Sequence, residues 1–165
     1  MEISALREND LRITPSVLDR LIDLDPRSTN EAPKSRLSGL ADLKSSVRRD
    51  VEWLLNSRRG LAKIDENMEE LNLSLAAYGL PDFTTLSIKN PDERDILTEA
   101  LESALEYFEP RLIAVQVTLE PFSDNDKQLT FRIEASLNVE PSPEPVVFDT
   151  VLQAGSGEFQ VVEKS

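Results

Sequence analysis

The sequence contains neither cysteine nor histidine, and aromatic residues make up only 5% of its 165 positions. Without cysteine and histidine the chain has no thiolate nucleophile, no imidazole base and neither of the two commonest zinc ligands. No apolar run approaches the length of a membrane span, and the first ten residues lack the apolar core of an export signal. We therefore expect no catalytic residues, metal or cofactor, no membrane insertion, and a cytoplasmic location.

Basic residues are also scarce, because 18 of them face 31 acidic ones and leave a formal net charge of −13. Such a surplus repels phosphate backbones and anionic membranes, so nucleic acid is not an expected partner. The carboxylates are scattered along the chain, which is typical of a solvated surface. Hydrophobic residues make up 39% of the chain, enough for one packed core. We expect a flexible N-terminus at residues 1–13 and a single domain at 14–165.

Four segments in the first two thirds of the chain carry apolar residues at the helical spacing of three or four. They run from Thr14 to Leu24, from Leu40 to about Gly60, from Asp65 to Ala77, and from Pro91 to Phe108. Gly60 is expected to end the second helix in the left-handed conformation, and the fourth must end before Pro110. A proline-containing loop at 25–36 separates the first two helices.

Beyond Pro110 the apolar period changes from 3.6 to 2, which predicts strands. Strands are expected at 112–119, 129–139, 146–152 and 158–162, with a hairpin loop at 123–127. In the first strand, Ile113, Val115, Val117 and Leu119 should share one face. The predicted fold class is therefore α+β, with about four N-terminal helices followed by a C-terminal antiparallel sheet of about four strands.

The triplet Glu109-Pro110-Arg111 lies where the fourth helix meets the first strand. The fixed proline backbone sets the direction of the charged residues on either side, which suits recognition of a partner. A plain helix stop with two solvated charges is the other interpretation. The triplet alone does not decide between them.

A second candidate is the segment 47–59, which contains the only tryptophan, Trp53, and four arginines, among them Arg48 and Arg49. Such a face could bind acidic partner surfaces. Alternatively, the arginines pair with Asp50 and Glu52 on the same helix. We expect Trp53 to be half-buried packing rather than an interface anchor.

Four segments together carry a resemblance to a known family: 16–21, 46–58, 78–83 and 108–112. In this order they resemble TssE, the baseplate subunit family of the type VI secretion system, which is similar to the small wedge protein of contractile-tailed phages. The resemblance implies that Glu109-Pro110-Arg111 holds the chain to the wedge bundle of TssF and TssG. It also implies that the sheet, like part of the TssB/TssC sheath subunits, links the first sheath ring to other baseplate proteins.

An exposed sheet edge can accept a strand from another chain, so the C-terminal hairpin, including Val161, is the candidate docking edge. Two other functions remain open. One is a carboxylate-dependent, lysozyme-like peptidoglycan hydrolase, against which the missing export signal argues. The other is a regulatory adaptor with the same fold.

Overall fold

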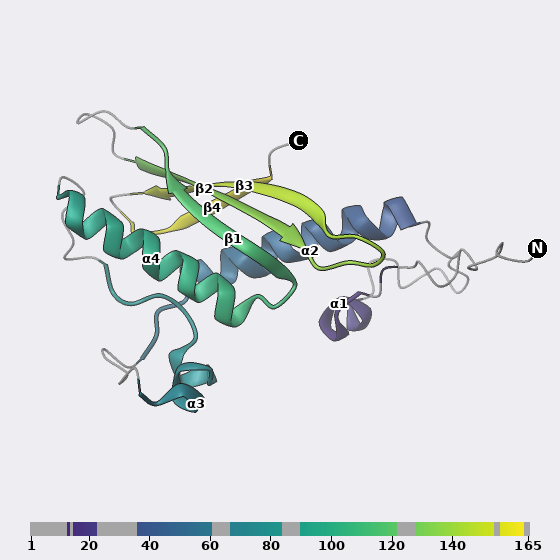
Figure 1. The fold of residues 1–165 in the computed structure, drawn as a ribbon, viewed down its shortest axis with the longest axis horizontal. Coiled ribbons are helices and arrows are strands. Elements are labelled where there is room, and N and C mark those ends of the chain that lie inside the picture. Colours follow the sequence, from purple (N-terminus) through teal and green to yellow (C-terminus); the bar gives the residue numbers. More distant parts are fainter. Residues whose placement is uncertain are drawn as a thin grey trace, which may run out of the picture.

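Two long helices and a four-stranded sheet make up most of the described structure (Figure 1). This computed structural model describes residues 13, 15–22, 36–60, 67–83, 90–121, 128–153 and 156–163. The helices are α1 (Val17–Leu21), α2 (Arg36–Asn56), α3 (Glu69–Asn72) and α4 (Pro91–Phe108), with a 3₁₀ turn at Leu75–Ala77. The strands are β1 (Leu112–Leu119), β2 (Gln128–Leu137), β3 (Glu144–Gln153) and β4 (Phe159–Glu163).

The strands pair antiparallel in the order β1-β2-β3-β4, so β1 and β4 form the two edges. The predicted α+β class, with helices preceding an antiparallel sheet, is confirmed. α2 packs against β4 and α4 against β1, so the core lies between the two helices and one face of the sheet (Figure 1). Phe131 of β2 and Phe148 of β3 are completely buried there.

Helix α4 begins as its sequence predicts. The Asn90 side chain accepts a hydrogen bond from the Asp92 N–H group, and Pro91 occupies the first turn. Its apolar stripe, which includes the buried Leu101 and Leu105, faces the core. The helix ends at Phe108, two residues before Pro110, also as predicted.

Helix α2 buries the expected stripe, including Val47 and Val51, but it ends at Asn56 and not near Gly60. After Asn56 the chain pairs with Leu80 instead of continuing as a helix. Leu80 donates from its N–H to the Ser57 carbonyl at 2.8 Å and accepts from the Arg59 N–H at 3.0 Å. This pairing satisfies backbone groups that a longer helix would have used.

The predicted third helix is not continuous. One turn of α3 is followed by a 3₁₀ turn, and Ser74 caps the second turn by accepting from the Ala76 N–H. Leu75, which the helical spacing placed on a buried stripe, is 86% exposed. α3 lies away from the sheet, so among the described residues the sheet offers it no apolar surface on which to complete the helix (Figure 1).

The first helix is shorter than predicted. α1 covers Val17–Leu21, and it contains no buried residue. The expected flexible N-terminus at residues 1–13, the loop at 25–36 and the hairpin loop at 123–127 lie outside the described residues, apart from Ile13 and Arg36.

A β-bulge in β1 overturns the predicted strand face at Ile113, whereas Val115 and Val117 face the core as predicted. Leu112 pairs with Leu137, but Gln116 pairs with Glu134, so β1 has one extra residue between them. Ala114 takes up this residue with a φ of 53°. The bulge turns Leu112 into the core and Ile113 outward, whereas strict alternation predicted the reverse.

Candidate functional site

The triplet Glu109-Pro110-Arg111 forms a tight turn between α4 and β1. The Leu112 N–H donates to the Glu109 carbonyl at 3.0 Å, which closes the turn with proline at its second position. Pro110 is exposed, but Glu109 is only 4% exposed. The alternative of two solvated charges is therefore wrong for Glu109.

Arg111 satisfies the buried Glu109 carboxylate. Its Nε and Nη2 atoms both donate to Glu109, forming a two-pronged ion pair. Nη2 also lies 2.7 Å from Oδ2 of Asp50 on α2, and Nη1 donates to Oγ of the buried Ser46 at 3.3 Å. Arg111 thus joins the α4–β1 turn to α2, and its guanidinium is occupied by two carboxylates of its own chain.

The ion pairs continue from Asp50 to α1. Arg49 donates to Oδ1 of Asp50 and lies 2.9 Å from Oδ1 of Asp19. Oδ2 of Asp19 accepts from the hydroxyls of Ser46 and Ser16, each at 2.6 Å. We call the five charged residues Asp19, Arg49, Asp50, Glu109 and Arg111 the charge network. It connects three segments that are far apart in the sequence.

The charge network shifts the pKa values of Asp19 and Arg111 in the directions that their contacts predict. Burial, the largest single influence on Asp19, raises its pKa. The hydrogen bonds from Ser16, Ser46 and Arg49, together with the charge of Arg49, outweigh burial and lower the pKa from 3.8 to about 2. The pKa of Arg111 is raised, first by its hydrogen bonds to Glu109 and also by Asp50, although burial opposes the shift.

A pocket of about 270 Å³ lies beside this turn, and we call it the turn pocket. Its walls come from α1, α2, the segment before the bridge at Leu80, and the α4–β1 turn. The residues that line it are Ser16, Asp50, Leu54, Tyr78, Phe108, Glu109, Pro110 and Arg111. The rings of Tyr78 and Phe108 meet edge to face with centroids 5.3 Å apart.

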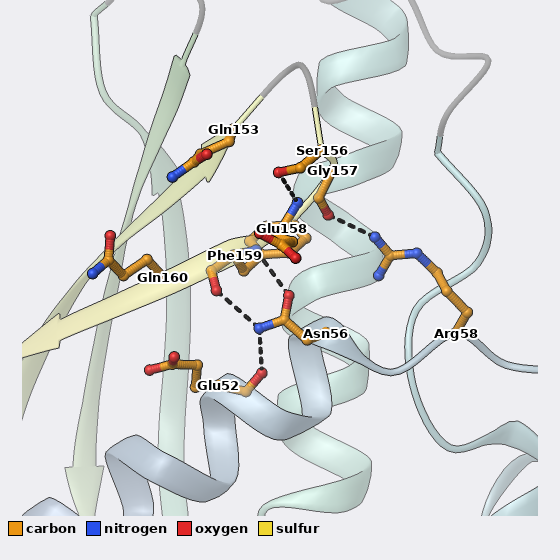
Figure 2. Close-up of a pocket in the computed structure, with 9 residues that line it drawn as sticks. All are labelled: Glu52, Asn56, Arg58, Gln153, Ser156, Gly157, Glu158, Phe159 and Gln160. Atoms are coloured by element: carbon orange, nitrogen blue, oxygen red, sulfur yellow. Dashed lines mark hydrogen bonds between the residues drawn. The ribbon is translucent and has the colours of Figure 1, made fainter.

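A second pocket, of about 550 Å³, lies beside β4 at the end of α2, and we call it the edge pocket (Figure 2). The Asn56 side-chain amide accepts from the Phe159 N–H at 2.9 Å and donates to the Phe159 carbonyl at 2.8 Å. Arg58 reaches across and donates to the Gly157 carbonyl at 2.7 Å. Asn56 at the end of α2 and Arg58 just after it therefore both bind main-chain groups of the C-terminal hairpin.

The predicted site residues fall into two groups. Glu109, Pro110, Arg111 and Arg49 surround the turn pocket or belong to the charge network behind it. Arg48 instead donates to the Val161 carbonyl at 3.1 Å and lies 3.8 Å from Glu52. Arg48 and Arg49 are thus paired with acidic residues of their own chain, which is one of the two interpretations that the sequence left open.

Trp53 is more exposed than expected. Its side chain is 54% exposed, and the Arg49 guanidinium lies 5.1 Å from the ring centroid. This cation–π contact places the ring beside the charge network rather than in the core.

Sequence reasoning missed Asp19, Ser46, Asn56 and Tyr78 as site residues. Only Asp19 had a local signal, because Ser16-Val17-Leu18-Asp19 has the spacing of a capping box and the Asp19 N–H does donate to the Ser16 hydroxyl. That spacing does not reveal that Asp19 contacts Arg49, which follows it by 30 residues.

Replacing Asp19 with alanine is expected to release α1 without unfolding the core, since α1 buries no residue and Asp19 bonds it to α2. Hydrogen exchange should become fast at the amides of Arg20 and Ile22, which bond within α1. The melting temperature should fall by only a few degrees. Arg20→Ala, on the same helix, is the matched control and should leave exchange unchanged. Global unfolding of Asp19→Ala would contradict this expectation.

The contacts of Asp19 in the wild-type chain should also weaken in acid. Because the folded-state pKa of Asp19 is lowered to about 2, its contribution is complete above pH 4 and is lost as the pH falls through 2.

Among the described residues, no three acidic side chains lie close enough together to hold a metal ion. None of the described helices is both long and apolar enough to cross a membrane.

The fold defines a small α+β domain in which an antiparallel meander is backed by two helices. The family model of the baseplate wedge protein gp25 matches residues 41–142, more than half of the sequence. The chain therefore belongs to the baseplate wedge protein gp25 family, which confirms the resemblance to a baseplate wedge family.

One solved structure with a similar chain is "The baseplate complex from the type VI secretion system". The two chains are 20% identical with a TM-score of 0.48, and the alignment covers 68% of this chain and 96% of the other. No curated protein matches the sequence significantly.

Proposed function

We propose that this chain is a structural, cytoplasmic baseplate component of a type VI secretion system that links a TssF/TssG wedge to the first ring of a TssB/TssC sheath. Membership of the gp25 wedge family is the observation that carries the proposal. The wedge contact is assigned to the Glu109-Pro110-Arg111 turn and the sheath contact to the edge of the sheet.

The position of β4 supports the sheath contact. β4 is an edge strand, and antiparallel pairing turns the main-chain groups of every second residue away from the partner strand. Since Gln153 and Glu158 bond directly to each other, Phe159 and Val161 face the free edge. A strand arriving there must compete with Asn56 at Phe159 and with Arg48 at the Val161 carbonyl.

We further propose that the chain acts without catalysis. A glycoside hydrolase needs one carboxylic acid that carries a proton for the leaving oxygen. Asp50 and Glu109, the two carboxylates at the turn pocket, both accept hydrogen bonds from Arg111, so ion pairing within the chain already occupies both groups. The purified chain should leave the turbidity of a peptidoglycan suspension unchanged, and clearing that depends on either residue would refute a purely structural role.

Val161→Pro tests the sheath contact. Proline removes an N–H group that faces the free edge and leaves the bonds to β3 intact, so the fold should persist while sheaths become rare. Val161→Ala is the matched control, because it loses the same buried packing but retains the N–H group. The measurement is the number of fluorescent sheaths per cell, with a thermal melt of each purified variant.

Two results would count against this edge. Equal sheath numbers in folded Val161→Pro and Val161→Ala cells would show that the edge of β4 is not where the sheath binds. Equal losses in both would assign the effect to packing.

A further inference from the structure

The turn pocket has the features of a socket for a single side chain. Four separate segments form its walls, and its volume of about 270 Å³ suits one long side chain rather than a strand or helix. The faces of the Tyr78 and Phe108 rings carry negative quadrupole charge, which attracts cations. Pro110 is exposed and adds apolar surface that can hold an aliphatic stem.

The electrostatics of the pocket also favour a cation. The charge network contains three carboxylates and two guanidinium groups, so one negative charge remains unbalanced. The pKa of the Tyr78 hydroxyl is raised, mainly by burial and also by the charges of Asp50 and Glu109. The charges of Asp50 and Glu109 therefore make the electrostatic potential negative at the Tyr78 ring, which lines the pocket.

Arg111 does not change this preference. Both of its neighbouring carboxylates already accept from it, and its Nη1 atom donates to Ser46. An acidic side chain from a partner would have to displace Glu109 or Asp50, and a displaced Glu109 would remain buried without a partner.

We propose that the turn pocket receives one lysine or arginine side chain from the baseplate partner, with its stem against Pro110 and its cationic head near Tyr78, Asp50 and Glu109. This inference rests on the proposed wedge contact and names the chemistry of that contact. It reverses the simplest expectation for a turn that ends in arginine, which is an acidic partner.

Substitutions at Pro110, which lines the pocket and is exposed, test the sign of the incoming charge. Pro110→Glu, Pro110→Gln and Pro110→Lys lose the same turn proline and differ mainly in charge. We expect Pro110→Lys to bind the TssF/TssG complex on the order of tenfold more weakly than Pro110→Glu, with Pro110→Gln between them. Affinities would be measured on purified complexes at low salt, after equal melting temperatures have been verified.

Any other order of the three affinities overturns the inference. The reverse order would show that the partner inserts an acidic side chain. Equal weakening by Glu and Lys relative to Gln would identify an apolar one, and three affinities equal to that of the wild type would show that nothing enters the pocket.

A second measurement separates this inference from the proposed function. The wild-type chain would be titrated with N-acetyl-arginine amide, N-acetyl-glutamate amide and N-acetyl-leucine amide while the NMR signals of the Tyr78 and Phe108 rings are followed. Saturable shifts with the arginine probe alone support a cation socket, even if the chain fails to bind TssF/TssG and the proposed function falls. Shifts with another probe, or with none, refute the socket.

Discussion

Replacing Arg111 with alanine is expected to lower the free energy of unfolding by about 3 kcal/mol, because it leaves the carboxylate of Glu109 buried without a counter-charge. Asp50 would retain Arg49 as its partner, so most of the loss comes from Glu109. Chemical denaturation of the purified variant measures the change.

Two variants distinguish this cause from lost packing. Arg48→Ala removes a partly buried arginine that has one long ion pair, at 3.8 Å, and one hydrogen bond to the Val161 carbonyl, and it should cost about 1 kcal/mol. Adding Glu109→Leu to Arg111→Met should restore part of the stability that Arg111→Met loses, because the buried charge is then gone. A double variant no more stable than Arg111→Met would refute the charge explanation. Any effect of Arg111 on partner binding must therefore be measured beside its effect on folding.

Gly79→Ala is expected to destabilise the chain by about 3 kcal/mol or more, from backbone strain and a direct clash. Gly79 has a φ of 95°, and a Cβ atom there would lie 2.6 Å from the Ser57 carbonyl oxygen. That carbonyl accepts the hydrogen bond from the Leu80 N–H, and the Leu80 side chain is completely buried. The substitution should therefore loosen the bridge that ties the chain to the end of α2.

Gly60→Ala is the matched control for Gly79→Ala. Among the described residues other than its chain neighbours, none has an atom within 4 Å of a Cβ built at Gly60, and the φ of Gly60 is not in the left-handed region. Alanine there should change the stability by less than about 1 kcal/mol, in the stabilising direction, because it restricts the unfolded chain. Similar melting temperatures for the two alanine variants would contradict this account of Gly79.

The apolar spacing predicted α2, α4 and the strands because each of these elements buries one face against the core. It failed where burial was absent. The segment that forms α3 and the following 3₁₀ turn has the same spacing, but its Leu75 is 86% exposed. Spacing also missed the bulge at Ala114, since one extra residue in a strand leaves no mark on composition.

The candidate site divides in the same way. The turn at Pro110 was predictable because proline fixes its own backbone and disfavours helix at the preceding residue. The spacing of apolar residues also changes from 3.6 to 2 after Pro110. The contact between Arg111 and Asp50 was not predictable, because Asp50 lies 61 residues before Arg111. The contact between Arg49 and Asp19 was not predictable either, because it joins residues 30 positions apart.

The sequence by itself determined the α+β class, the boundaries of α4 and the position of the turn, because these depend on propensity and period within a few residues of chain. Only the tertiary structure decided that Glu109 is buried, that Arg111 is occupied by its own chain, and that Arg48 and Asn56 bind the edge of β4. Those outcomes depend on which charged groups come within hydrogen-bond distance when α2, α4 and the sheet pack together. Local sequence does not determine that packing.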